Sequence, residues 1–130
     1  MRLSTGAMEE ILLEHPDVTD CAVIGVKNDL KGEIPCGFVV VSPGRDPSKE
    51  NELLSELVSL VRKKLGPVSN FKKVAVVKAL PKTRSGKVLR GTMRKIGNKE
   101  EYTITPTIED PNIFDVLAPV ILNLVDGKQG

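Results

Sequence analysis

Two apolar runs separated by a short polar link limit what this chain can fold into. Residues 20–26 read DCAVIGV and residues 34–41 read IPCGFVVV, and the link between them is polar and contains a glycine. Continuous apolar runs of this length, rich in β-branched side chains, predict strands that are buried on both faces. The turn residues of the link indicate that the strands pair as an antiparallel hairpin.

Helical patterns surround this hairpin. Four stretches carry apolar residues at helical spacing: residues 5–15, 50–65, 88–96 and 110–124. Ser4 or Thr5 can cap the first helix, and Asp110 followed by Pro111 can begin the last. A third strand is expected over residues 72–80. The predicted fold class is α+β, with a small three-stranded sheet packed with three to four helices.

Length and composition restrict the class of protein further. With 130 residues, we expect one domain with a core over residues 1–98 and an extension with one helix over residues 99–130. No apolar run approaches the ~20 residues of a membrane span, and the first residues lack the apolar core of a signal peptide. Cys21 and Cys36 lie in apolar runs without a CxxC pattern, which favours buried free thiols. We expect an intracellular protein, cytoplasmic or in the mitochondrial matrix.

Positive charge is concentrated in one block of the chain. Residues 57–99 contain thirteen of the nineteen Lys and Arg residues and no Asp or Glu, although the net charge is only +2. A block of one sign indicates an anionic partner, either nucleic acid or the phosphates of a nucleotide. Single-strand binding also requires aromatic stacking, and Phe71 is the one aromatic residue of the block. We therefore favour a small polyphosphate ligand.

The most informative segment of this block follows the third predicted strand. Residues 81–87 read PKTRSGK and place Lys82, Arg84 and Lys87 on a loop that Gly86 allows to bend sharply. A lysine on such a loop can bring a cation to phosphate or carboxylate oxygens where negative charge develops. On the charge pattern alone, a solvated basic turn is the favoured interpretation.

The same seven residues resemble the C-terminal signature of the adenylate-forming acid–CoA ligases. Four further segments resemble that family at its own spacing: RLST at 2–5, HPDV at 15–18, KGE at 31–33 and RKKLGP at 62–67. The spacings are similar to those of the short-chain branch, the acetate– and propionate–CoA ligases. The segment TIEDP at 107–111 resembles the propionate enzymes most closely.

This resemblance implies that the chain is the small C-terminal domain of such an enzyme. In the family, a large N-terminal adenylation domain binds ATP and the acid, and the small domain closes over it. The acid attacks the α-phosphate of ATP, with Mg²⁺ present, to give an acyl-adenylate and pyrophosphate. The small domain then rotates, and coenzyme A takes the acyl group. The chain resembles only the small domain, so the large domain and most of the acid pocket are absent from it.

The resemblance also implies roles for individual residues. Lys87 aligns with the catalytic lysine of adenylation, which is also the family's site of inhibitory acylation. Its charge would orient the carboxylate and the α-phosphate. Arg2 aligns with an arginine that contacts the ATP phosphates, and Arg62 with one at the nucleotide end of coenzyme A. Arg62 is equally explained as a charge that complements a helix C-terminus.

Related enzymes also hold a cation at positions that align with Leu13, His15 and Val18, two of which would contribute backbone carbonyls. A single histidine at the end of an apolar stripe is more often simply packed there. Three alternatives to the propionate enzyme stay open: an acetate–CoA ligase domain, a non-catalytic nucleotide- or CoA-binding module, and a small RNA-binding domain.

Overall fold

The computed structural model describes residues 4–30, 32–67 and 70–127. Its elements, in chain order, are α1 (Thr5–Leu12), β1 (Val18–Asn28), β2 (Gly32–Val41), the 3-10 helix η1 (Pro47–Lys49), α2 (Glu50–Leu65), β3 (Lys73–Val76), α3 (Arg90–Gly97) and α4 (Ile113–Val125). The α+β class with a three-stranded sheet and four α-helices in the described part of the chain is confirmed. None of these described helices has the length and apolar character needed to cross a membrane.

The sheet has the order β1-β2-β3, with β2 in the centre. The antiparallel β1–β2 hairpin extends from the pair Val18↔Val41 to the pair Asn28↔Gly32, which confirms the predicted hairpin. β3 runs parallel to β2, because α2 crosses one face of the sheet between these two strands. The sheet is therefore mixed, and its central strand is paired on both sides.

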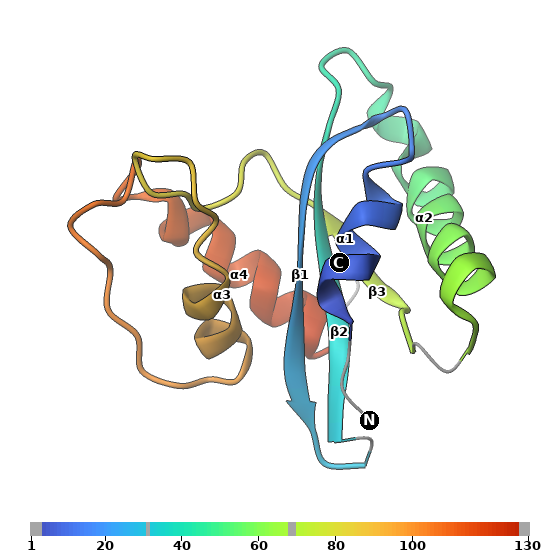
Figure 1. The fold of residues 1–130 in the computed structure, drawn as a ribbon. Coiled ribbons are helices and arrows are strands. Elements are labelled where there is room, and N and C mark those ends of the chain that lie inside the picture. Colours follow the sequence, from blue (N-terminus) through green and yellow to red (C-terminus); the bar gives the residue numbers. More distant parts are fainter. Residues whose placement is uncertain (1–3, 31, 68–69, 128–130) are drawn as a thin grey trace.

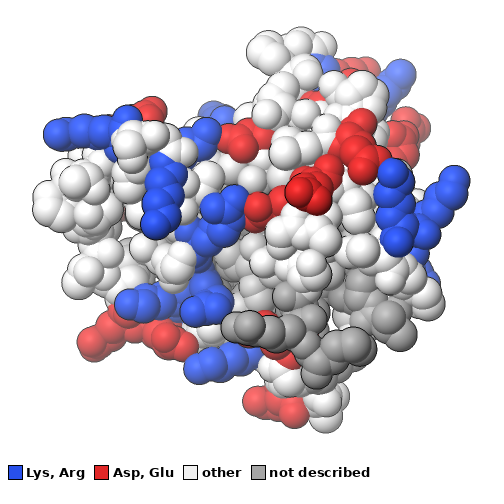
Figure 2. All heavy atoms as spheres, viewed as in Figure 1, with Lys and Arg blue, Asp and Glu red and all other residues white. Residues whose placement is uncertain are grey.

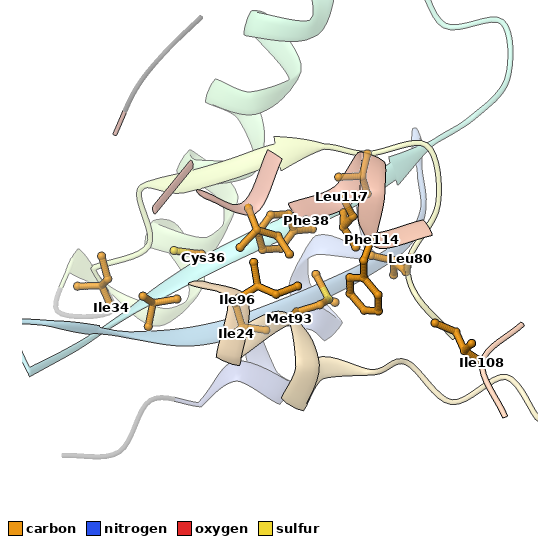
Figure 3. Close-up of a cluster of buried hydrophobic side chains, with 14 residues drawn as sticks. Ile24, Ile34, Cys36, Phe38, Leu80, Met93, Ile96, Ile108, Phe114 and Leu117 are labelled. Atoms are coloured by element: carbon orange, nitrogen blue, oxygen red, sulfur yellow. The ribbon is translucent and has the colours of Figure 1, made fainter. Parts of the chain in front are cut away.

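Helices cover both faces of the sheet, with α1 and α2 on one face and α3 and α4 on the other (Figure 1). Successive side chains of β1 point alternately to the two faces. Val23 belongs to the cluster under α1 and α2, whereas Ile24 belongs to the cluster under α3 and α4. Figure 3 shows the second cluster around Phe38, where α3 contributes Met93 and α4 contributes Phe114. Burial on both faces explains why the hairpin strands are apolar throughout.

Two predicted boundaries are corrected by the structure. The third strand was expected over residues 72–80, but β3 ends at Val76. The Val77 N–H still donates to the carbonyl of Val39 on β2 (2.9 Å), and the chain then leaves the sheet. Val77 and Leu80 bury their side chains in the cluster under α3 and α4. The apolar run therefore continues after the strand has ended. The helix expected over residues 88–96 is α3, which begins two residues later at Arg90.

Two predicted helix caps are also corrected. Ser4 occupies the N-cap position of α1, but its side chain makes no capping hydrogen bond. The last helix begins at Ile113 with Asn112 as its N-cap, and not at Asp110–Pro111. The Asp110 carboxylate instead accepts the backbone N–H of Asn112 in a turn that precedes the helix (3.0 Å). The extension over residues 99–130 stays a prediction as a separate unit, and α4 packs in the same core as the strands.

The two cysteines are buried free thiols, as predicted. Burial raises the pKa of Cys21 to about 12 and that of Cys36 to about 11. Because the thiolate is the reactive form, we expect both thiols to react with an aromatic disulfide reagent at pH 8 at least about a hundredfold more slowly in the folded chain than in denaturant. Labelling of the native chain at the rate of the unfolded chain would contradict the buried placement.

Candidate functional site

The candidate site is the loop of residues 81–89, here called the lysine loop. The Thr83 N–H donates to the carbonyl of Lys87 (2.9 Å), and the Gly86 N–H donates to the carbonyl of Thr83 (2.9 Å). The Thr83 hydroxyl also accepts the N–H of Lys87 (3.1 Å). Gly86 has a φ of 92°, a conformation in which a residue with a Cβ would be strained. The loop is therefore closed by its own hydrogen bonds.

The base of the loop is closed where the chain passes into α3. Lys82 and Val88 form an antiparallel bridge, and the Leu89 N–H donates to the carbonyl of Pro81 (2.8 Å). Pro81 is buried, and Leu80 just before it is 5% exposed. This anchoring holds the start of the loop against the core.

The outer edge of the loop is paired with the segment of residues 105–109, about twenty positions later in the sequence. The Arg84 N–H donates to the carbonyl of Thr107 (2.9 Å), and the Glu109 N–H donates to the carbonyl of Lys82 (2.8 Å). Ile108, between these two bonds, is 4% exposed and belongs to the core cluster. The backbone of the loop is thus held both by hydrogen bonds within the loop and by hydrogen bonds to residues 105–109.

Two ion pairs tie the loop and the start of α3 to the rest of the domain. Lys82 Nζ lies 2.6 Å from Asp20 Oδ2 of β1. Arg90, the first residue of α3, makes a two-pronged contact with Glu9 of α1, with its Nε 2.7 Å from Oε2 and its Nη2 2.8 Å from Oε1. Sequence reasoning missed Glu9 and Arg90, because a pair 81 positions apart leaves no local pattern.

In contrast to Lys82, Lys87 is exposed and has no hydrogen-bond or ion-pair partner for its ammonium group among the described residues. Arg84, on the same loop, is also exposed. On the face shown in Figure 2, Lys and Arg side chains gather over the lysine loop and α3, whereas Asp and Glu gather over α1. The loop thus presents a cation to solvent from a backbone that is held on several sides. Such a group is suited to contact an anion supplied by another domain or a ligand.

Arg62 lies elsewhere, in the last turn of α2, and its side chain is exposed. Figure 1 shows that α2 and the lysine loop lie on opposite sides of the sheet. The structure therefore does not bring Arg62 and Lys87 together. Lys63 and Lys64 share the last turn with Arg62, so the complement to the helix dipole is equally consistent with its position. The prediction for Arg2 lies outside the described residues.

The proposed cation position falls at the turn between α1 and β1. His15 Nε2 lies 2.7 Å from Glu56 Oε1, and His15 Nδ1 accepts the N–H of Asp17 (3.1 Å). The carbonyl of His15 accepts the N–H of Val18 (3.1 Å). Both ring nitrogens are thus engaged within the protein, and Leu13 is half exposed beside them. Cation binding by Leu13, His15 and Val18 stays a prediction, and the described residues contain no group of three or more His, Cys, Asp or Glu that could hold a metal ion.

Residues 7–87 match the model of the AMP-binding enzyme C-terminal domain, so the chain belongs to this family. The match ends at Lys87, the last residue of the PKTRSGK segment. The chain is 57% identical over 113 residues to "Acyl-CoA synthetase short-chain family member B, mitochondrial" of Dictyostelium discoideum, covering 87% of this chain and 16% of that protein. It is 45% identical over 120 residues to "Acyl-CoA synthetase short-chain family member 3, mitochondrial" of Rattus norvegicus, covering 92% of this chain and 17% of that protein.

Solved structures agree with this assignment. A crystal structure of an acyl-CoA synthetase from Brucella canis matches 73% of this chain with a TM-score of 0.66 and 37% sequence identity, and the match covers 17% of that protein. The fold is therefore that of the C-terminal domain of adenylate-forming enzymes, and the chain is homologous to short-chain acyl-CoA synthetases. It spans less than a fifth of the length of the relatives it matches.

Proposed function

We propose that this chain acts as the mobile C-terminal domain of an ATP-dependent short-chain acid–CoA ligase, with propionate as the acid and Lys87 as its adenylation lysine. The observation that carries this proposal is the exposed ammonium of Lys87, which has no partner among the residues that the structure describes and stands on a loop held by backbone bonds from both sides. The similarity to short-chain acyl-CoA synthetases supports the reaction class.

In the first half-reaction, a carboxylate oxygen of the acid bonds to the α-phosphorus of ATP, and pyrophosphate leaves. The Lys87 ammonium contacts the carboxylate and an α-phosphate oxygen, which brings the two anions together and offsets charge in the transition state. Arg2 contacts the remaining phosphates of ATP, and Mg²⁺ accompanies the nucleotide. A large N-terminal adenylation domain supplies the remaining surface for ATP and the acid.

In the second half-reaction, the thiol of coenzyme A attacks the acyl carbon, and AMP leaves. Arg62 binds a phosphate at the nucleotide end of coenzyme A, for which a guanidinium fork is suited. The placement of Arg62 and the lysine loop on opposite sides of the sheet supports a rotation between the two half-reactions, because one orientation cannot present both groups to one site.

Acylation of Lys87 is proposed to switch the first half-reaction off. The modification removes the positive charge that the reaction requires, and the exposed side chain is open to a modifying enzyme.

We propose that the protein is intracellular, in the cytoplasm or the mitochondrial matrix. Both relatives named above carry "mitochondrial" in their names. An acetate–CoA ligase is the second candidate, because the chain is also 39% identical over 118 residues to "Acetyl-coenzyme A synthetase" of a Bradyrhizobium strain.

Acid-dependent exchange of pyrophosphate into ATP by the full-length enzyme tests this function. We expect exchange with propionate to be faster than with acetate or butyrate under matched conditions. Faster exchange with acetate would show that the enzyme is an acetate–CoA ligase instead. No exchange with any of the three acids, together with retained binding of coenzyme A, would favour a non-catalytic module instead.

A further inference from the structure

One carboxylate, that of Glu9, joins three elements of the domain. Glu9 lies on α1, and its Oε2 accepts the backbone N–H of Val23 on β1 (2.8 Å). The same carboxylate receives both prongs of the Arg90 guanidinium at the start of α3. The Glu9 side chain is only 16% exposed. Charge-assisted, two-pronged bonds of this kind fix orientation as well as distance.

Arg90 links this carboxylate to the lysine loop. It is three positions after Lys87 and directly follows Leu89, whose N–H closes the base of the loop on Pro81. The hydrogen bond to Glu9 raises the pKa of Arg90. A shift of Arg90 would move the attachment point of the loop, whereas the outer edge of the loop is held separately by residues 105–109.

We infer that Glu9 is a positioning residue for adenylation, which sets the place of the Lys87 ammonium by fixing Arg90 at the base of the lysine loop. This inference rests on the proposed function of Lys87. Glu9 touches neither the substrates nor Lys87, so its effect is transmitted through Arg90 and the loop backbone. Because a misplacement of about 1 Å can reduce a rate by a factor of about a hundred, a small displacement of the loop is sufficient.

The variant Glu9→Gln separates positioning from folding. The glutamine carbonyl can still accept the N–H of Val23, but it no longer offers two charged oxygens to Arg90. Glu14→Gln is the matched control, because Glu14 lies just beyond the same helix and forms an ion pair with Lys64 of α2 instead. Both variants remove one negative charge, and only the first loosens the base of the lysine loop.

In the full-length enzyme, we expect Glu9→Gln to reduce kcat for acid-dependent pyrophosphate exchange by about ten- to a hundredfold, with KM for the acid changed by less than about threefold. Thioester formation from supplied acyl-adenylate should stay within about twofold of wild type, and the thermal midpoint should match that of Glu14→Gln. Adding Glu9→Gln to Arg90→Gln should produce no further loss, because the two residues act through one contact. An equal loss in both half-reactions, a loss in Glu14→Gln, or additive effects would overturn the inference.

A second measurement keeps this inference separate from the proposed function. Hydrogen exchange of the backbone amides of residues 83–89 should be at least about fivefold faster in Glu9→Gln than in Glu14→Gln. If wild-type enzyme exchanges no pyrophosphate with any acid, the proposed function fails, and amide exchange still decides whether Glu9 holds the loop. Equal exchange in the two variants would overturn the positioning role even if Lys87 proves essential.

Discussion

Replacing Lys87 by alanine in the full-length enzyme is expected to reduce acid-dependent pyrophosphate exchange by about a thousandfold or more. The hydrogen bonds that hold the backbone of the lysine loop do not involve the Lys87 side chain, so the loop should keep its shape in this variant. The variant removes the cation that we propose to lie where the carboxylate meets the α-phosphate. Removing a single preorganised group of this kind lowers kcat by about a hundred- to a thousandfold. Loss of its contribution to bringing two anions together adds to this effect.

The matched control is Arg62→Ala, on the opposite side of the sheet. It should leave pyrophosphate exchange within about threefold of wild type and raise KM for coenzyme A in thioester formation. Lys87→Ala should show the reverse pattern, with thioester formation from supplied acyl-adenylate retained. Equal losses of both half-reactions in Lys87→Ala would contradict the assignment of Lys87 to the first step alone.

Replacing Phe38 by alanine is expected to lower the free energy of unfolding by about 3–5 kcal/mol. Phe38 is fully buried on the central strand, and its ring fills the space between β2, α3 and α4. Because a domain of this kind has a total free energy of unfolding of about 5–15 kcal/mol, the variant should be close to unfolding at physiological temperature. Denaturant titration of this chain, followed by circular dichroism, measures the change.

Leu30→Ala is the control for this second prediction, because Leu30 is 95% exposed between the hairpin strands. It should change the free energy of unfolding by less than about 0.5 kcal/mol. If Phe38→Ala were as mild as this control, the face of the sheet under α3 and α4 would not be packed as described here.

The elements that could be predicted from the sequence are those marked by a pattern of neighbouring residues. The hairpin of β1 and β2 was predicted because both runs are apolar throughout, and α2 was predicted with its observed bounds of Glu50–Leu65. Gly66 at the end of α2 has a φ of 87°, which accounts for glycine at that position. The sharp bend predicted at Gly86 is likewise accounted for by its φ of 92°.

Features that depend on contacts between distant parts of the chain could not be predicted from local sequence patterns. β3 pairs with β2 only over Lys73–Val76, and the apolar run continues because Val77 and Leu80 pack in the core cluster instead. The pairing of Arg84 with Thr107 and of Arg90 with Glu9 depends on how the helices pack on the sheet. The role proposed for Lys87 rests on a motif in the sequence, whereas the contacts that support the lysine loop became visible only in three dimensions.

The support that residues 105–109 and α4 provide has a consequence for biosynthesis. These residues leave the ribosome after the lysine loop, yet they close its outer edge and cover the adjoining face of the sheet. A nascent or truncated chain that ends near Lys99 would contain Lys87 and every residue matched by the family model. It would still lack the segment that holds the loop in place. The lysine loop would therefore gain the support of its outer edge only after residues 105–109 have been synthesised.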